Sequence, residues 1–223
     1  MSVKVFGYGS LMSFSSALST CPSVSDFAPA VLLGYRRRFS LVSISGLRTG
    51  GADLDTLEMA ALGIEPSHAQ PYAQVNGCSF DIAEGDLASY LEREARYELV
   101  RVTIDVNGSL HPSVVTVVPF ATNEAYITAK FDPASGDPAQ RWHERVGQYY
   151  TGSLFERTDI LPMRGYLRDC LSSALALGGA TWLDNFLDQC VCADGVTTMR
   201  QYIEKHPDRV SLPPHTLTDR LTN

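Results

Sequence analysis

The chain has 223 residues, which is the scale of one large domain or of a domain with an extension. Hydrophobic residues make up 44% and charged residues 19%, as in a globular protein with a real core. The sequence has no run of about 18 apolar residues and does not start with a basic segment followed by an apolar one. We therefore expect no membrane span and a cytoplasmic protein. The net charge of −7 leaves no basic surface from which counterion-driven nucleic-acid binding starts, so no nucleic-acid partner is predicted.

The first predicted element is a short apolar strand at residues 3–7, which runs into the stretch VFGYGSLM at residues 5–12. A Gly-x-Gly turn allows positive φ and lets a ligand approach bare backbone, so that several N–H groups point into one small space. Such a turn therefore predicts a place that holds an anion or a developing negative charge. The alternative is a tight strand-to-helix turn in which Ser10 caps the helix. A short helix at residues 13–18 follows the turn and ends before Pro22.

Residues 30–44 predict one or two strands with Gly34 as a bulge, and residues 45–56 predict a polar, glycine-bearing loop. Three arginines, Arg36 to Arg38, lie within the strand-like YRRRFSLV. Because successive side chains alternate across a strand, at least one of them faces the opposite side from its neighbours, and structural pairing or solvation is expected. Two more strands are predicted at residues 56–64 and 73–82.

A helix is predicted to begin at Asp86, with the pattern DLASYLEREARY. Leu87, Tyr90, Leu91 and Glu94 fall at i, i+3, i+4 and i+7, which is the spacing of a core-facing stripe. The last member of this stripe is charged, so Glu94 is predicted to point inward.

An inward carboxylate is costly unless it is paired or used. Its neighbours Glu92 and Arg93 lie off the stripe and are interpreted as solvated charges. The alternative, in which Glu94 caps the helix or pairs with Arg96 or Arg101, stays open.

From Tyr97 the pattern alternates as a strand, and another strand is predicted at residues 111–121. Beyond these the composition becomes helical, with helices at residues 138–150, 162–177, 181–189 and 197–206. The sequence thus predicts a β-rich first part with few helices, up to about residue 129, and a helical second part.

The five cysteines are an odd number and do not form a disulfide framework, which favours a reducing compartment. Cys190 and Cys192 lack the further ligands that a tetrahedral metal site requires, so no metal is predicted.

The glycine turn fails three familiar signatures. Met12 stands where a dinucleotide fingerprint needs its third glycine, the residues after Ser10 do not complete G-x-S-x-G, and no Gly-Lys-Ser/Thr is present.

Two segments together are more specific than either alone. GYGSL after the first strand, combined with FDIAEGDLASYLEREARYELVRVTI at residues 80–104, resembles the γ-glutamylcyclotransferase-like superfamily. That family pairs a YGSL or YGSN turn with a leucine followed by a glutamate, here Leu91 and Glu94, and then a tyrosine, here Tyr97. PMRGY at residues 162–166 is similar to the segment that opens the family's closing helix.

The resemblance implies an α+β fold, a small mixed β-barrel flanked by helices with a helical C-terminal extension. Residues 1–134 would form the barrel core, and residues 135–223 a helical part that completes or extends the same domain.

The resemblance also implies an enzyme that releases 5-oxoproline from a small γ-glutamyl compound, without metal or cofactor. Glu94 is the implied general acid and base. The implied substrate-binding residues are Gly7, Tyr8, Gly9, Ser10, Leu11 and Tyr166. The backbone N–H groups of Gly9, Ser10 and Leu11 would form an anion cradle for the γ-carbonyl oxygen or the α-carboxylate of the substrate. Trp182 or Phe186 is a candidate for a second pocket aromatic. Members differ in leaving group, among them glutathione, γ-glutamyl amino acids, γ-glutamyl-lysine crosslinks and acylated antibiotics, and this sequence does not choose among them.

Two other functions remain open. A serine or cysteine hydrolase would use Ser10 or Cys78, but none of the five histidines lies in a motif that positions it. A non-catalytic relative would bind an acidic metabolite in the same pocket. The helical second part is also a candidate dimer contact.

Overall fold

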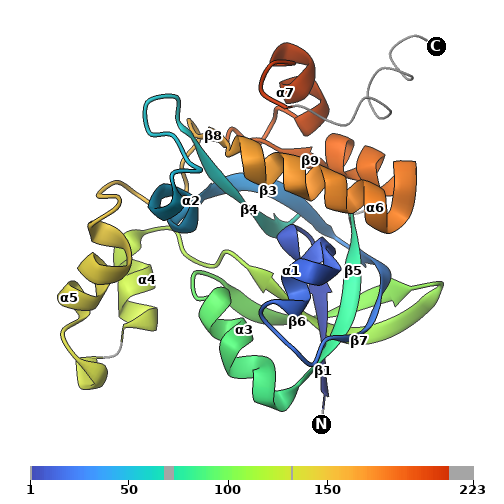
Figure 1. Cartoon of the computed structure of the whole chain (residues 1–223), viewed down its shortest axis with the longest axis horizontal. Coiled ribbons are helices and arrows are strands. Elements are labelled where there is room, and N and C mark those ends of the chain that lie inside the picture. The colour runs from blue at the N-terminus through green and yellow to red at the C-terminus, as the bar shows by residue number, and fades with distance from the viewer. Residues whose placement is uncertain (1, 68–72, 132, 211–223) are drawn as a thin grey trace.

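The computed structural model describes residues 2–67, 73–131 and 133–210, arranged as two sheets with helices around them (Figure 1). The strands are β1 (Ser2–Gly7), β2 (Ser25–Leu33), β3 (Tyr35–Val42), β4 (Glu58–Pro66), β5 (Gln74–Ala83), β6 (Glu98–Val106), β7 (Ser109–Val117), β8 (Leu161–Pro162) and β9 (Cys190–Val191). The helices are α1 (Phe14–Leu18), α2 (Ile44–Thr49), α3 (Leu87–Arg93), α4 (Asn123–Lys130), α5 (Pro138–Trp142), α6 (Arg164–Gln189) and α7 (Met199–Lys205).

Five strands close a barrel in the order β1-β5-β2-β6-β7. All its pairings are antiparallel except β1 with β7, which run parallel where Val5 faces Val114, so the barrel is mixed. Val5, Phe80 and Ile104 are fully buried in the core. The predicted α+β class, with a small mixed barrel and flanking helices, is confirmed.

A second sheet, which the sequence did not predict, has the order β8-β4-β3-β9. Its strands β3 and β4 correspond to the segments predicted at residues 30–44 and 56–64. Gly34 stands between β2 and β3 at φ +78°, so it ends one strand and begins the next instead of forming a bulge. The long helix α6 packs against β5. Gly178 and Gly179 interrupt its helical backbone, which agrees with the two separate helices predicted at residues 162–177 and 181–189.

One prediction for local structure is wrong. The segment expected to be a loop from residue 45 begins with α2, because Ser43 caps it by accepting a hydrogen bond from the Gly46 N–H at 3.1 Å. The β-rich first part also contains α4, which the sequence did not predict individually, and Thr122 caps it in the same way.

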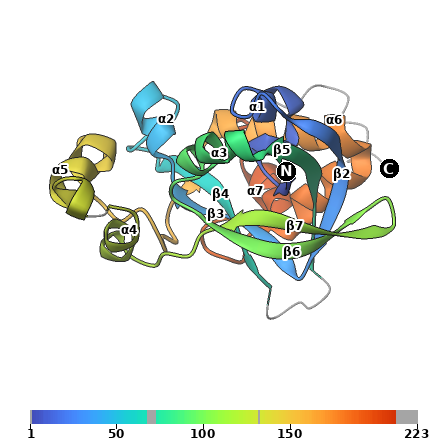
Figure 2. The same cartoon turned by 90° about the horizontal axis from the view of Figure 1, so that it is seen from below.

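Helices α4 and α5 lie to one side of the barrel in both views (Figures 1 and 2). A π-helical turn, His143–Gly147, continues α5. This group of α4, α5 and the π-helical turn, here called the helical arm, is held by aromatic packing of Tyr126 against Phe120, Phe131 and Phe155. The arm forms one wall of the site described next.

Candidate active site

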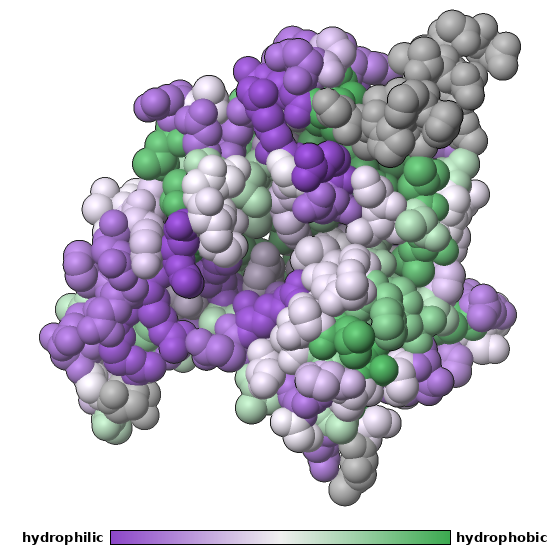
Figure 3. All heavy atoms as spheres, in the orientation of Figure 1, coloured by the Kyte–Doolittle hydropathy of each residue, from purple (hydrophilic) through white to green (hydrophobic). Residues whose placement is uncertain are grey.

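A cavity of about 650 Å³ lies between the barrel, the second sheet and the helical arm. Its lining comes from the turn after β1, from α2, from the chain after α3, from β7, from the arm and from the start of α6. The surface is hollowed at this place between α2 and α3 (Figure 3). The volume falls within the range of about 300–1,000 Å³ typical of small-molecule sites.

Glu94 lies at the C-terminal end of α3 and lines the cavity. Its side chain is 12% exposed, and its Oε1 lies 3.2 Å from the Nε of Arg93. Burial raises the pKa of the Glu94 carboxyl, while the positive charges of Arg93 and Arg96 act in the opposite direction. The carboxylate is buried as predicted, although α3 ends at Arg93 and Glu94 is its C-cap. Its partner is Arg93 and not Arg96 or Arg101.

The apolar stripe that pointed to Glu94 is only partly buried. Tyr90 is fully buried, whereas Leu91 is 46% exposed, so the prediction that Leu91 faces the core is wrong. The helix has only seven residues, and Tyr90 is the buried one among them.

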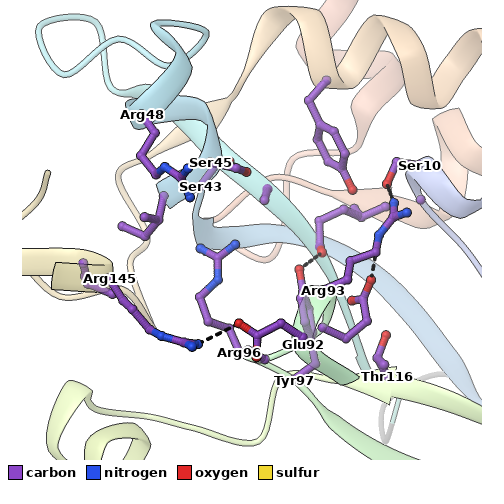
Figure 4. A pocket seen from close by; sticks show the side chains of 18 of the residues that line it. Ser10, Ser43, Ser45, Arg48, Glu92, Arg93, Arg96, Tyr97, Thr116 and Arg145 are labelled. Atoms are coloured by element: carbon purple, nitrogen blue, oxygen red, sulfur yellow. Dashed lines mark hydrogen bonds and ion pairs between the residues drawn. The ribbon is translucent and has the colours of Figure 1, made fainter. Parts of the chain in front are cut away.

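Arg93, interpreted from the sequence as a solvated charge, is half-buried and lines the cavity. Its guanidinium donates to Ser10 Oγ at 3.1 Å and to Thr20 Oγ1 at 2.6 Å, besides its ion pair with Glu94 (Figure 4). Arg93 thus joins the turn after β1 to the carboxylate. Two segments about 84 positions apart meet through this one side chain, a role that helical periodicity does not reveal.

The glycines of the turn are needed for space and not for positive φ, which corrects the expectation from the sequence. A Cβ on Gly7 would lie 2.8 Å from Leu11 Cβ and 2.9 Å from Cys78 Sγ. A Cβ on Gly9 would lie 2.8 Å from the Tyr166 hydroxyl oxygen. Gly7 does not line the cavity; it lets β1 pack closely behind the turn.

Arg37 fixes the orientation of the Tyr8–Gly9 peptide bond in the turn. Its side chain is fully buried and donates to the Tyr8 carbonyl oxygen at 2.9 Å, to the Asn76 carbonyl oxygen and to Asn185 Oδ1 at 3.0 Å. In a trans peptide the C=O and the following N–H point in opposite directions, so the Gly9 N–H points away from Arg37. Arg36 and Arg38 face the other side and pair with Glu65, as the strand alternation predicted.

The three N–H groups predicted to form an anion cradle are free to bind a ligand, as far as the described residues show. Within the described residues, the backbone N–H groups of Gly9, Ser10 and Leu11 donate to no protein oxygen. Ser10 does not cap a helix; Ser13 caps α1 by accepting from the Ser16 N–H. All three cradle residues line the cavity together with Glu94.

Tyrosines form another part of the lining. The Tyr8 hydroxyl donates to the Thr116 carbonyl oxygen at 2.9 Å, and the Tyr97 hydroxyl donates to the Leu62 carbonyl oxygen at 2.9 Å. Tyr166, at the start of α6, brings its hydroxyl against Gly9. Burial raises the pKa of all three phenols, so they stay protonated. Tyr97 was noticed in the sequence only as part of the motif.

The residues offered for a hydrolase do not form a nucleophile. Cys78 is fully buried, donates to the Leu11 carbonyl oxygen at 3.2 Å and does not line the cavity, and burial raises the pKa of its thiol far above neutral pH. Ser10 accepts a hydrogen bond from Arg93, and no described residue that lines the cavity is a histidine. His68 and His215 lie outside the described residues.

The other pocket aromatics considered from the sequence lie elsewhere. Trp182 donates to the Gly77 carbonyl oxygen at 2.9 Å, and Phe186 is fully buried beside Arg37. Neither lines the cavity. Among the described residues there is no cluster of three or more His, Cys, Asp or Glu side chains arranged to hold a metal ion, and no helix is long and apolar enough to cross a membrane.

Comparison with solved structures finds chains of the γ-glutamylcyclotransferase-like kind. One is a gamma-glutamyl cyclotransferase, 20% identical, matching 53% of this chain and 67% of its own length with a TM-score of 0.42. A human protein described as uncharacterized is 18% identical over 68% of this chain and 92% of its own, with a TM-score of 0.43. A yeast gamma-glutamyl cyclotransferase specific to glutathione is 16% identical over 68% of this chain and 89% of its own, with a TM-score of 0.39.

Neither a scan of protein-family models nor a search of curated proteins gives a match. At these identities and TM-scores the likeness carries no argument about activity. The function has to be argued from the site itself.

Proposed function

We propose that the protein is a γ-glutamylcyclotransferase-type enzyme that releases 5-oxoproline from a γ-glutamyl compound. The observation that carries this proposal is the meeting, in one cavity, of the Glu94 carboxylate and a turn whose N–H groups at Gly9, Ser10 and Leu11 have no protein acceptor within the described residues. A base and an anion cradle facing one space are what an intramolecular acyl transfer requires.

In the proposed reaction, the substrate's own α-amine attacks its γ-carbonyl carbon. A new C–N bond closes the five-membered ring, and the amide bond to the leaving amine breaks. An α-amino group has a pKa near about 8, so it is mostly protonated at neutral pH and must lose a proton before its lone pair is free. From the ammonium form, the attacking nitrogen loses two protons in all, one before the attack and one as the ring closes. Glu94 passes them in turn to the departing nitrogen, so that 5-oxoproline and a protonated amine leave without consumption of water.

Ring closure places negative charge on the γ-carbonyl oxygen. The N–H groups of the turn would stabilise this oxyanion or hold the α-carboxylate, and one such donor is typically worth about 3 kcal/mol in the transition state. Arg37 supports this role, since it holds the Tyr8 carbonyl away from the cavity. Tyr8 and Tyr166 supply protonated phenols on either side of the turn.

The raised pKa of Glu94 suits a group that both takes and returns a proton near neutral pH. The charge of Arg93 acts against this rise in pKa, and the ion pair holds the carboxylate in place. A carboxylate buried only for structure would need no open space beside it, whereas Glu94 borders a cavity with room for a ligand.

The test is a panel of γ-glutamyl amino acids, γ-glutamyl amines and glutathione, with 5-oxoproline measured by mass spectrometry. We expect release from at least one member and a loss of about 100-fold or more in Glu94→Gln, since a positioned general base contributes about 10²–10⁴-fold. Glu84→Gln, which removes an exposed carboxylate that does not line the cavity, is the matched control and should retain full activity.

Two results would contradict the proposal. Activity that survives in Glu94→Gln but disappears in Ser10→Ala would move the chemistry to a serine nucleophile. Tight binding of an acidic metabolite by the wild type, with no 5-oxoproline from any substrate, would instead indicate a non-catalytic binding protein. A cytoplasmic location and a homodimer formed through the helical part stay predictions.

A further inference from the structure

The cavity has two ends of different character. Ser10, Arg93 and Thr116 lie at one end, where Arg93 pairs with Glu94. At the other end Arg48 and Arg145 lie on the side of the helical arm, with Arg96 between the ends (Figure 4). With about 650 Å³ in all, the cavity has room for a leaving group beside a γ-glutamyl group. The far end is therefore where the leaving group would lie.

Four arginines line the cavity, although the chain as a whole carries a net charge of −7. Two of them are occupied: Arg93 pairs with Glu94, and Arg145 pairs with Glu92 at 3.0 Å. The positive charge that remains belongs to Arg48, from α2, and to Arg96, from the chain after α3.

Within the described residues, neither Arg48 nor Arg96 meets a carboxylate. Arg96 donates to the Val42 carbonyl oxygen at 2.8 Å, and the Arg48 guanidinium lies 5.9 Å from the centre of the Tyr149 ring. The remaining acidic group of the lining, Glu144, accepts from Gln140 at 2.9 Å. The guanidinium groups of Arg48, at the far end, and of Arg96, between the ends, thus keep donors that no carboxylate of the described residues accepts from, and guanidinium matches carboxylate geometry well.

Resting on the proposed function, we propose that the leaving group carries a second anionic group besides the carboxylate of an ordinary α-amino acid. Acidic amino acids, and short peptides with an acidic side chain, are the substrate class. Arg48 and Arg96 bind the added carboxylate and so determine specificity, while the bond-making step at Glu94 is unchanged.

The experiment compares γ-glutamyl-glutamate with γ-glutamyl-glutamine, which have the same shape and differ by one charge. We expect kcat/KM for 5-oxoproline release to be about tenfold higher for γ-glutamyl-glutamate, equal to about 1.4 kcal/mol. The preference should decrease with added salt, because exposed charges are screened. Arg48→Gln should bring the two substrates within about twofold of each other by raising KM for the acidic one.

Arg48→Gln is the cleaner variant, because Arg96 also lowers the pKa of Glu94 and its removal changes the chemistry as well as the binding. Arg168→Gln, an exposed arginine of α6 outside the cavity, is the matched control and should keep the full preference. Equal rates for the two dipeptides, or a preference that Arg48→Gln leaves intact, would overturn the inference.

Failure of this inference is distinguishable from failure of the proposed function. Calorimetric binding of the same two dipeptides to Glu94→Gln measures the charge preference without turnover. If no substrate yields 5-oxoproline, the proposed function fails, and about tenfold tighter binding of γ-glutamyl-glutamate would still support the anionic site. Equal binding would overturn it.

Discussion

Arg93 occupies the position between the two halves of the proposed chemistry. Its Nε lies 3.2 Å from Glu94 Oε1, and another nitrogen of the same guanidinium donates to Ser10 Oγ at 3.1 Å. A cation at this distance favours the ionised carboxylate, while burial favours the neutral acid. Burial has the larger effect on Glu94, so its pKa stays above the usual value for a glutamate. The charge of Arg93 makes this upward shift smaller.

Arg93→Met is therefore expected to raise the pKa of Glu94 further. Because the proposed base acts only when ionised, the acid limb of the kcat/KM profile should move to higher pH. Arg93→Lys keeps the charge and should move the limb less. The measurement is 5-oxoproline release against pH for the three proteins. An acid limb that stays in place or moves to lower pH in Arg93→Met would contradict the ion pair's proposed role.

Single side chains also show what the sequence could and could not predict about the site. Glu94 was found because an apolar stripe continued onto a charged residue, and that signal is local. Arg93 was missed because its partners Ser10, Ser16 and Thr20 are far from it in the chain. Only the fold brings them together, and helical spacing places Arg93 on the wrong face for this role.

At the scale of elements, the turn after β1 depends on the helix that closes over it. A Cβ on Gly9 would lie only 2.8 Å from the Tyr166 hydroxyl oxygen of α6, so a side chain there requires Tyr166 or the turn to shift. From the sequence, the glycines could be needed either for positive φ or for close approach of another group to the backbone. Only the packing of α6 on the turn shows that close approach is the reason. The same holds for α2 and α4, which the sequence did not predict. Their residues line the cavity only because the helical arm and the second sheet are packed around it, and the local sequence does not carry that information.

Gly9→Ala should consequently displace Tyr166 or the turn by a few tenths of an ångström or more. We expect kcat/KM to fall by about 10²-fold, because small displacements of a positioned group have effects of this size. Tyr166→Phe removes the oxygen that a new Cβ would meet at 2.8 Å, so the double variant should recover part of the loss of Gly9→Ala. The check is a double-mutant cycle on kcat/KM, with circular dichroism to show that the fold is kept. Additive losses would indicate that the two positions do not contact each other in solution.

For the whole molecule, the sequence predicted the class of fold but not its second sheet. The strands of the barrel were recognisable because each is a separate alternating segment bounded by turn residues. The pairing of β3 with β9 joins Arg37 to Cys190, about 150 residues away in the chain, and no local pattern carries that information. Arg37 is the residue at which these distant parts meet: it belongs to β3, contacts β5 through Asn76, and reaches α6 through Asn185.

Arg37→Met is the variant that tests this connection. The change leaves the Tyr8 and Asn76 carbonyl oxygens and Asn185 without their donor, and each unpaired buried acceptor costs about 1–3 kcal/mol. Part of this cost is offset, because burial of the guanidinium is itself unfavourable and lowers the pKa of Arg37 to about 10. We expect a net loss of about 2–5 kcal/mol in the free energy of unfolding, measured by urea denaturation.

Arg36→Met is the matched control for this prediction. It removes the neighbouring arginine, whose ion pair with Glu65 is about one-third exposed on both sides, and it should change the stability by no more than about 1 kcal/mol. Arg37→Met should also lose most cyclotransferase activity, even below its unfolding transition, because the Tyr8 carbonyl is then free to rotate and the Gly9 N–H no longer has a fixed direction. A stable Arg37→Met protein with full activity would show that packing alone, without the buried cation, holds the turn in place.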